Sequence, residues 1–305
     1  MNVTSQRSIY PGKDFSAWPF HKAARAYELV CQLRDEYNSY RASLGRESVS
    51  ESDPTQRIFS VRARLRHEPD SIRWSLLFGD AIHNYRASLD AFAWEMAHLE
   101  GATLADELEH RLYFPLARTQ AHWAAMVKST LSSMPSFVRD RLEINQPFRY
   151  GEPDLAAGVV LHRLDLTDKH RASLAMMIEM ASRSTFALRV ESFENSDSFS
   201  MAGIASEELW RQEPVRDGAL LWRFRSELPL RSLVIDKLPM YLSVSDGDEN
   251  LRAFDLLDLI DRQVVGILLS TCFGVPSSNW TSYILGDQPR PEMVVEDLSG
   301  STACG

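Results

Sequence analysis

The chain has 305 residues, of which 44% are hydrophobic and 25% are charged, and its formal net charge at pH 7 is −9. These proportions are typical of a globular protein that is long enough to bury a large core. The negative charge argues against non-specific nucleic-acid binding, which needs a basic surface. Because the N-terminus lacks a basic segment followed by an apolar run, we expect no secretory signal and a cytoplasmic protein.

The N-terminal part of the chain combines a helical pattern with a strand pattern. Apolar residues spaced three and four apart predict a long amphipathic helix from about residue 18 to residue 44. Residues 45–56 are polar and are expected to form a connector. From Phe59 to Leu65, apolar residues alternate with serine and arginine, which predicts a strand over residues 57–65 with one buried face.

The segment Ser71 to Gly101 is the longest helical pattern in the chain, and Asp70 or Ser71 is a suitable N-cap. One continuous stripe of its apolar residues faces a core, and consists of Trp74, Phe78, Ala81, Tyr85, Leu89, Phe92, Met96 and Leu99. His83, Arg86 and Asp90 lie on roughly the opposite side, together with further apolar residues. We therefore expect this second face to meet another element, a partner or a ligand.

The rest of the chain changes from helices to strands and back. Shorter helices are predicted near 118–130, near 135–144 and from Pro153 to about Thr167. Alternating patterns near 186–190, 220–224 and 233–235 predict strands, which should pair mostly antiparallel because no helices separate them. A last helix is expected over about 250–273, and its acidic residues argue against a membrane span.

These elements predict an α+β fold, in which a helical bundle around a long central helix packs with a mostly antiparallel sheet. We expect a single domain over residues 1–285, followed by a disordered tail over 286–305. Its helical part would span about 18–170 with the strand at 57–65, and its sheet part about 172–245. The final helix at about 250–273 would close the domain.

Two polar clusters could carry chemistry. The first consists of Asp80, His83, Asn84, Arg86 and Asp90 on the central helix, and the second of His162, Arg163, Asp165, Asp168, Lys169, His170 and Arg171. Asp80 with His83, and His162 with Asp165, are each spaced i and i+3, so each pair can point the same way from its helix. Two such pairs could hold a divalent metal between helices, which would make the protein a metal-dependent hydrolase.

A structural interpretation of the same residues stays open. Arg86 can pair with Asp90 one turn along the helix, and His83 and Asp90 can hydrogen-bond to neighbouring backbone. Lys169, His170 and Arg171 suit the negative end of a helix dipole. On this interpretation the protein is a noncatalytic binding or scaffold protein. The chain contains no GxSxG elbow, no phosphate-binding loop and no dinucleotide fingerprint, and its three cysteines form no CxxC pair.

Two segments that carry the clusters, GDAIHNYRASLDAFAWEMA and LTDKHR, resemble sequence blocks of a group of uncharacterised bacterial proteins. The blocks read GDxxHNxRxxLD and DKHR. In that group a strand precedes the first block, and strands and a last helix follow the second. The resemblance covers most of the chain from about 57 to 273, and it implies no activity.

The second segment also resembles the HEPN domains, helical bundles that include many metal-independent ribonucleases of toxin and antiphage systems. An arginine and a histidine with four to six residues between them mark these domains, and Arg163 and His170, which have six residues between them, match that spacing. The resemblance implies His170 as general acid or base and Arg163 as the group that stabilises phosphate charge. It also implies His83, Arg86 and Asp90 in support, RNA as the partner, a homodimer and no cofactor. Whether the protein is an enzyme stays open.

Overall fold

A computed structural model of the chain describes residues 17–170, 174–181, 188–192, 204–209, 214–235, 237–246 and 249–274. The chain forms two compact units, each assembled from segments that are separate in the sequence. The helical unit comprises the residues up to Leu33, Ser75–Leu174 and the residues from Phe254 onward. The sheet unit comprises Arg34–Trp74 and Ala175–Ala253. The single domain over 1–285 stays a prediction, and the expected tail over 286–305 lies outside the described residues.

Each predicted helical pattern corresponds to a described helix, but the helix expected from Pro153 begins at Ala157, after a 3-10 turn, and the short helix Asp106–Glu109 was not predicted. The described helices are α1 (Trp18–Leu44), α2 (Ser71–Ala97), α3 (Asp106–Glu109), α4 (Gln120–Lys128), α5 (Ser136–Ile144), α6 (Ala157–His170) and α7 (Ala253–Phe273). Short 3-10 turns occur at Leu99–Gly101, Pro147–Arg149 and Pro153–Leu155. The carboxylate of Asp70 accepts the backbone N–H of Arg73 at 3.2 Å, so Asp70 is an N-cap of α2. None of the helices in the described ranges is long and apolar enough to cross a membrane.

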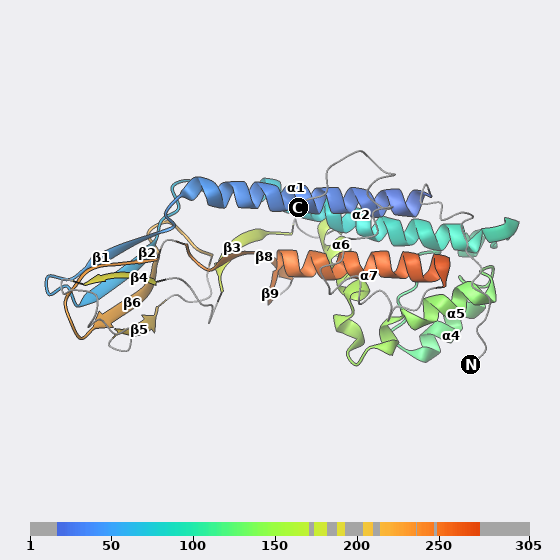
Figure 1. Cartoon of the computed structure of the whole chain (residues 1–305). Helices are drawn as coiled ribbons and strands as arrows, with labels where there is room; N and C mark the ends of the chain where they lie inside the picture. Colours follow the sequence, from blue (N-terminus) through green and yellow to red (C-terminus); the bar gives the residue numbers. More distant parts are fainter. Residues whose placement is uncertain are drawn as a thin grey trace. The chain divides into compact units, whose positions relative to one another are not determined.

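Helix α2 is the centre of the helical unit (Figure 1). The stripe predicted to face the core is buried from Trp74 to Met96, whereas Leu99 is half-buried and lies in the 3-10 turn that follows α2. Hydrogen bonds fix two neighbouring helices against it. The Tyr85 hydroxyl donates to Oδ1 of Asp261 on α7 at 2.7 Å, and the Ser88 hydroxyl donates to the carbonyl of Pro19 on α1 at 2.7 Å. The stripe thus places α2 within the core.

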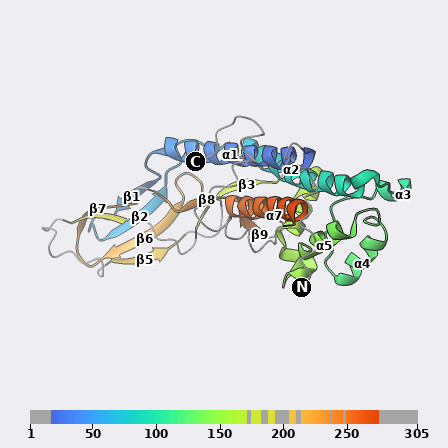
Figure 2. The same ribbon diagram turned by 45° about the vertical axis from the view of Figure 1, so that its right-hand side comes forward.

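Helices α4 and α5 form a second layer of the helical unit and lie near each other in both views of the ribbon (Figure 2). The indole N–H of Trp123 on α4 donates to the carboxylate of Glu143 on α5 at 3.0 Å. Arg141 of α5 donates to the carbonyl of Thr271 at 2.7 Å, which satisfies a carbonyl in the last turn of α7. These contacts fix α4 to α5, and α5 to the end of α7.

The sheet unit contains all the described strands. They are β1 (Ser48–Ser52), β2 (Ile58–Ala63), β3 (Met176–Met180), β4 (Leu188–Ser192), β5 (Ile204–Glu208), β6 (Leu220–Ser226), β7 (Leu230–Ile235), β8 (Met240–Asp246) and β9 (Glu249–Arg252). The order in the largest sheet is β1-β2-β6-β5, a second sheet has the order β3-β8-β9, and β4 pairs with β7. Every pairing among these strands is antiparallel. The fold is therefore α+β, as predicted.

A buried carboxylate holds part of the sheet unit together. Glu47 is fully buried, and its two oxygens accept from Nε and Nη2 of Arg41 at 3.1 and 2.6 Å. The same carboxylate accepts from the ammonium of Lys237 at 3.3 Å and from the backbone N–H of Leu238 at 2.6 Å. These contacts tie the end of α1 to the turn between β7 and β8. Residues 45–56, predicted to be only a connector, thus contain both this anchor and strand β1.

Candidate functional site

Helices α2 and α6 run in opposite directions where they cross, so residues later in α2 contact residues earlier in α6. Gly79 of α2 lies against Asp168 of α6, where an added Cβ would lie 2.8 Å from Oδ2 of Asp168. Four residues further along α2, Nδ1 of His83 lies 3.1 Å from Oδ1 of Asp165. A side chain at position 79 would require the Asp168 carboxylate to shift. This arrangement brings the two polar clusters of the sequence together.

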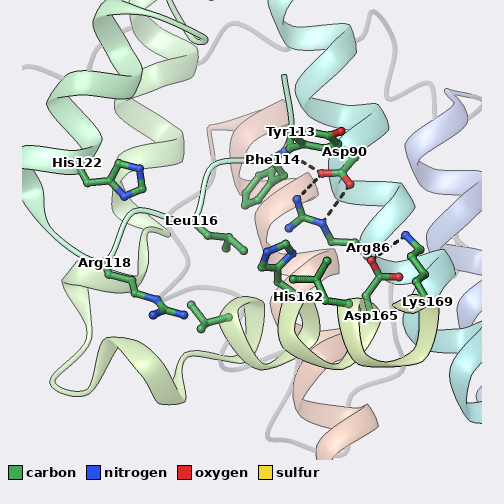
Figure 3. Close-up of a pocket in the computed structure, with 12 residues that line it drawn as sticks. Arg86, Asp90, Tyr113, Phe114, Leu116, Arg118, His122, His162, Asp165 and Lys169 are labelled. Carbon is green, nitrogen blue, oxygen red and sulfur yellow. Dashed lines mark hydrogen bonds and ion pairs between the residues drawn. The ribbon is translucent and has the colours of Figure 1, made fainter. Parts of the chain in front are cut away.

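A cavity of about 730 Å³ opens beside this crossing (Figure 3). We call it the α2–α6 cavity. Its lining comes from α2, from the segment between α3 and α4, from α4 and from α6, and consists of Arg86, Asp90, Tyr113, Phe114, Leu116, Arg118, His122, Val159, His162, Asp165, Leu166 and Lys169. All of these residues belong to the helical unit. The volume falls in the range of pockets that hold small organic molecules.

Arg86 is held in the cavity wall by a two-point ion pair. Its Nε donates to Oδ2 of Asp90 at 3.1 Å and its Nη2 donates to Oδ1 at 2.6 Å. Oδ1 of Asp90 also accepts the backbone N–H of Phe114 at 2.9 Å. The Arg86 side chain is 5% exposed, so the guanidinium has little freedom to move. The sequence predicted this i, i+4 pair in its structural interpretation.

Asp165 is the second anchored carboxylate of the cavity. Its side chain is 6% exposed, and Oδ2 accepts from the ammonium of Lys169 at 2.8 Å, one turn later on α6. Oδ1 faces Nδ1 of His83, whose side chain is 47% exposed. Each oxygen of Asp165 therefore has a partner, and the carboxylate links α2 to α6. Lys169 keeps ammonium donors beyond the one that Asp165 uses.

His162 lies on α6 one turn before Asp165, and differs from the other polar groups of the cavity. Its Nδ1 is buried and has no hydrogen-bond partner within the described part of the chain. Burial lowers the pKa of His162 below its ordinary value of 6.5, and the nearby Arg86 cation lowers it further. The imidazole is therefore neutral at pH 7, when it can either donate or accept a hydrogen bond.

Arg86 also has an atom without a partner. Its Nη1 is buried, and no acceptor lies within hydrogen-bonding distance among the described residues. Buried polar atoms in folded proteins normally have partners, so each exception needs an explanation. Here two exceptions lie on residues that line one cavity, where a bound molecule or ordered water could supply the missing partners.

The cavity combines these polar groups with apolar walls. Phe114, Leu116, Val159 and Leu166 supply apolar surface, and Tyr113 adds a largely exposed ring. Arg118 lines the cavity too, and its guanidinium lies 3.1 Å from the exposed carboxylate of Asp154. Such a mixture of apolar walls and a few fixed polar groups is typical of binding sites for organic molecules.

The structure brings together some of the predicted residues and leaves others apart. Those that meet at the crossing or line its cavity are His83, Arg86, Asp90, His162, Asp165 and Lys169. Asp80 is exposed, and the Asn84 amide donates to the carbonyl of Asp80 within α2. Arg163 is exposed and lies outside the lining, because it follows His162 on the helix. The side chain of His170 and all of Arg171 lie outside the described residues.

The candidate metal ligands do not form a cluster in the described chain. No group of three or more histidine, cysteine, aspartate or glutamate side chains that could hold a metal ion occurs among the residues with described positions. His83 and Asp165 are in contact, but Asp80 points to solvent. The metal-dependent alternative stays a prediction. Of its four candidate ligands, His162 and Asp165 line the cavity.

Sequence reasoning missed the cavity wall outside the two clusters. Tyr113 to Leu116 are part of a segment with no helical or strand period, and Arg118 and His122 showed no ligand spacing. Arg118, Val159 and Leu166 look like ordinary residues until the chain folds. One available signal was the run Tyr113-Phe114-Pro115-Leu116, an apolar segment in a region of polar connectors.

Comparisons with protein-family models, with curated proteins and with solved structures gave no match for this chain. The resemblances to the bacterial group and to the HEPN domains therefore stay predictions.

Proposed function

We propose that the helical unit binds a small organic molecule in the α2–α6 cavity. The observation that carries this proposal is that Arg86 Nη1 and His162 Nδ1, two buried polar atoms with no partner among the described residues, lie on residues that line the same cavity. A ligand that offers hydrogen-bonding groups to both atoms would remove the cost of leaving them unsatisfied.

The wall of the cavity is already organised for binding. Asp90 fixes two guanidinium nitrogens of Arg86, and the Phe114 backbone fixes Asp90 in turn. Lys169 is held by Asp165. Groups whose positions are set before binding lose little entropy when a ligand arrives, which favours affinity. A purely structural network would be expected to satisfy its own members, and this network leaves two atoms open.

The proposal can be tested by protein-observed NMR on full-length chain with ¹³C-labelled leucine and valine methyl groups. Val159, Leu116 and Leu166 line the cavity and report on it directly. We would screen a library of small carboxylic acids, amides, alcohols and nucleosides. Ligands should shift these three methyl signals, and Arg86→Lys should weaken the shifts. Arg163→Lys is the matched control, because Arg163 lies on α6 outside the lining. A library without a single hit at these methyl groups would contradict the proposal.

A second candidate function, metal-independent cleavage of a phosphodiester, is favoured by one specific observation. His162 lines the cavity with Arg86, and its lowered pKa keeps the imidazole able to accept a proton near pH 7. In such a reaction His162 would take the proton of a ribose 2′-hydroxyl while O2′ attacks phosphorus. The 5′-oxygen would leave with a proton from solvent, and Arg86 and Lys169 would stabilise the negative charge on the phosphoryl oxygens.

Cleavage of a mixed RNA pool, with and without EDTA, tests this second candidate. Cleavage that survives EDTA and is lost in His162→Gln would support it. Cleavage lost in His170→Ala and Arg163→Ala but retained in His162→Gln would instead support the HEPN-type pair, Arg163 and His170. Cleavage abolished by EDTA would favour the metal-dependent alternative. A folded protein that cleaves no RNA would leave ligand binding as the function.

A further inference from the structure

We infer that the ligand of the α2–α6 cavity carries one head group with a single negative charge, attached to an apolar or aromatic body. A carboxylate and a phosphodiester share this chemistry. The inference rests on the proposed binding function, and it names the class of ligand that the cavity would select.

The charges of the lining set the charge of the ligand. The lining contains three cations, Arg86, Arg118 and Lys169, and two carboxylates, Asp90 and Asp165. With neutral histidines the formal charge of the lining is therefore +1, carried by Arg118, whose exposed partner Asp154 lies outside the lining. A singly charged anion would neutralise it. A phosphate dianion would leave the site with excess negative charge, and a neutral molecule would leave excess positive charge; either costs free energy where charges are partly removed from water.

The free donors of the lining suit one anionic head group. Asp90 uses the N–H of Nε and one N–H of Nη2, so Nη1 is the guanidinium nitrogen of Arg86 that has no partner among the described residues. An anionic head group that reaches Nη1 would make a charge-assisted hydrogen bond there. Lys169 adds donors on the same wall, because its ammonium has three and Asp165 uses one. Figure 3 shows Arg86, His162 and Lys169 on the two facing helices.

The apolar walls argue against a long polyanion. Phe114, Leu116, Val159 and Leu166 line the cavity and would be covered by an apolar or aromatic body. Further phosphates of a polynucleotide would find only Arg118 in the lining, because Asp90 and Asp165 already face Arg86 and Lys169. The cavity thus fits a small organic anion better than an extended nucleic acid.

Four probes with the same phenyl body test the inference at pH 7.5. They are benzoate, methyl phenyl phosphate, benzamide and phenyl phosphate, which present a carboxylate, a phosphodiester, a neutral amide and a group that is mostly dianionic at this pH. Each is titrated into the full chain while the methyl signals of Val159 and Leu116 are followed. The expected result is that benzoate or methyl phenyl phosphate binds at least about tenfold more tightly than the other two, as one hydrogen bond to a charged group allows.

Two variants make the test specific to the lining charge. Arg118→Gln lowers the formal charge of the lining to zero, and because Arg118 is exposed the fold should be retained. It should reduce the preference for the singly charged probes over benzamide. Arg163→Gln removes an equal charge one residue from His162 but outside the lining, and should leave the preference unchanged.

The outcomes separate the two proposals. Benzamide or phenyl phosphate binding as tightly as the best singly charged probe would overturn this inference and leave cavity binding intact. An equal loss of preference in Arg118→Gln and Arg163→Gln would overturn it as well, since a general charge effect would then explain the selectivity. If no probe and no library compound shifts the cavity methyl groups, the proposed function itself fails. Of the two preferred probes, the tighter one identifies the head group.

Discussion

Nδ1 of His83 on α2 lies 3.1 Å from Oδ1 of Asp165 on α6, although the two residues are 82 positions apart in the chain. The contact joins two polar clusters that are independent in the sequence. Asp165 also contacts Lys169 on its own helix, because its other oxygen accepts from the Lys169 ammonium. A buried carboxylate with one partner on each helix fixes how α2 and α6 cross, and so fixes the shape of the cavity beside them.

Asp165→Ala should lower the free energy of unfolding by about 1–3 kcal/mol, because His83 and Lys169 lose their shared acceptor. The loss should stay within that range, since both partners are partly exposed and water can solvate them. Urea denaturation measures the change. Asp80→Ala is the control, and as an exposed residue on α2 it should change stability by no more than about 0.5 kcal/mol. Equal losses in both variants would show that the α2–α6 contact contributes nothing.

Asp90→Ala should be more damaging, with a loss of about 3–5 kcal/mol, because it leaves the buried Arg86 guanidinium without its counter-ion. It also removes the acceptor of the Phe114 backbone N–H. The double variant Arg86→Met with Asp90→Ala should recover part of this loss, since it removes the uncompensated charge. Chemical denaturation of the two single variants and the double variant gives the coupling free energy. If the losses simply add, the ion pair is not the source of the effect.

The helices could be predicted from the sequence because their period reports a buried face. The stripe on α2 and the cap at Asp70 both appear in the structure. Strands β1 and β5 could not be predicted in this way. Both are edge strands with mostly exposed side chains, and backbone pairing to β2 and β6 holds them in place. A strand fixed by its main chain leaves little pattern in its residues.

In the candidate site, too, contacts within one helix could be predicted from the sequence and contacts between distant segments could not. The Arg86–Asp90 pair is local to one helix, so its spacing predicts it. The contacts of Asp90 with the Phe114 backbone and of His83 with Asp165 depend on how distant segments pack. Neither contact can be predicted from the spacing of residues in the sequence. That Nδ1 of His162 has no partner among the described residues can be seen only in the folded chain.

The lowered pKa of His162 predicts a pH dependence of stability. Between its ordinary value of 6.5 and the lower pKa of the folded state, the unfolded chain binds the proton more readily. In that range the free energy of unfolding should therefore rise with pH, and the contribution should level off above pH 6.5. His162→Gln should remove this slope, whereas His122→Gln, another histidine of the lining, should retain it. The measurement is urea denaturation at a series of pH values, compared as the difference between variant and wild type. A slope that persists in His162→Gln would assign it to other groups.

Glu47→Gln should destabilise the sheet unit by about 3–5 kcal/mol, because the fully buried carboxylate is the counter-ion of Arg41 and Lys237. An amide can accept from fewer of these donors and supplies no charge. Hydrogen exchange of the amides of β2, β6 and β8 measures the loss within the sheet unit itself. Glu51→Gln is the matched control on the neighbouring strand β1, where an exposed pair with Arg62 at 3.5 Å should contribute no more than about 1 kcal/mol. Similar protection in both variants would mean that the donors around Glu47 find water or other acceptors, and that the buried carboxylate is not the anchor of this unit.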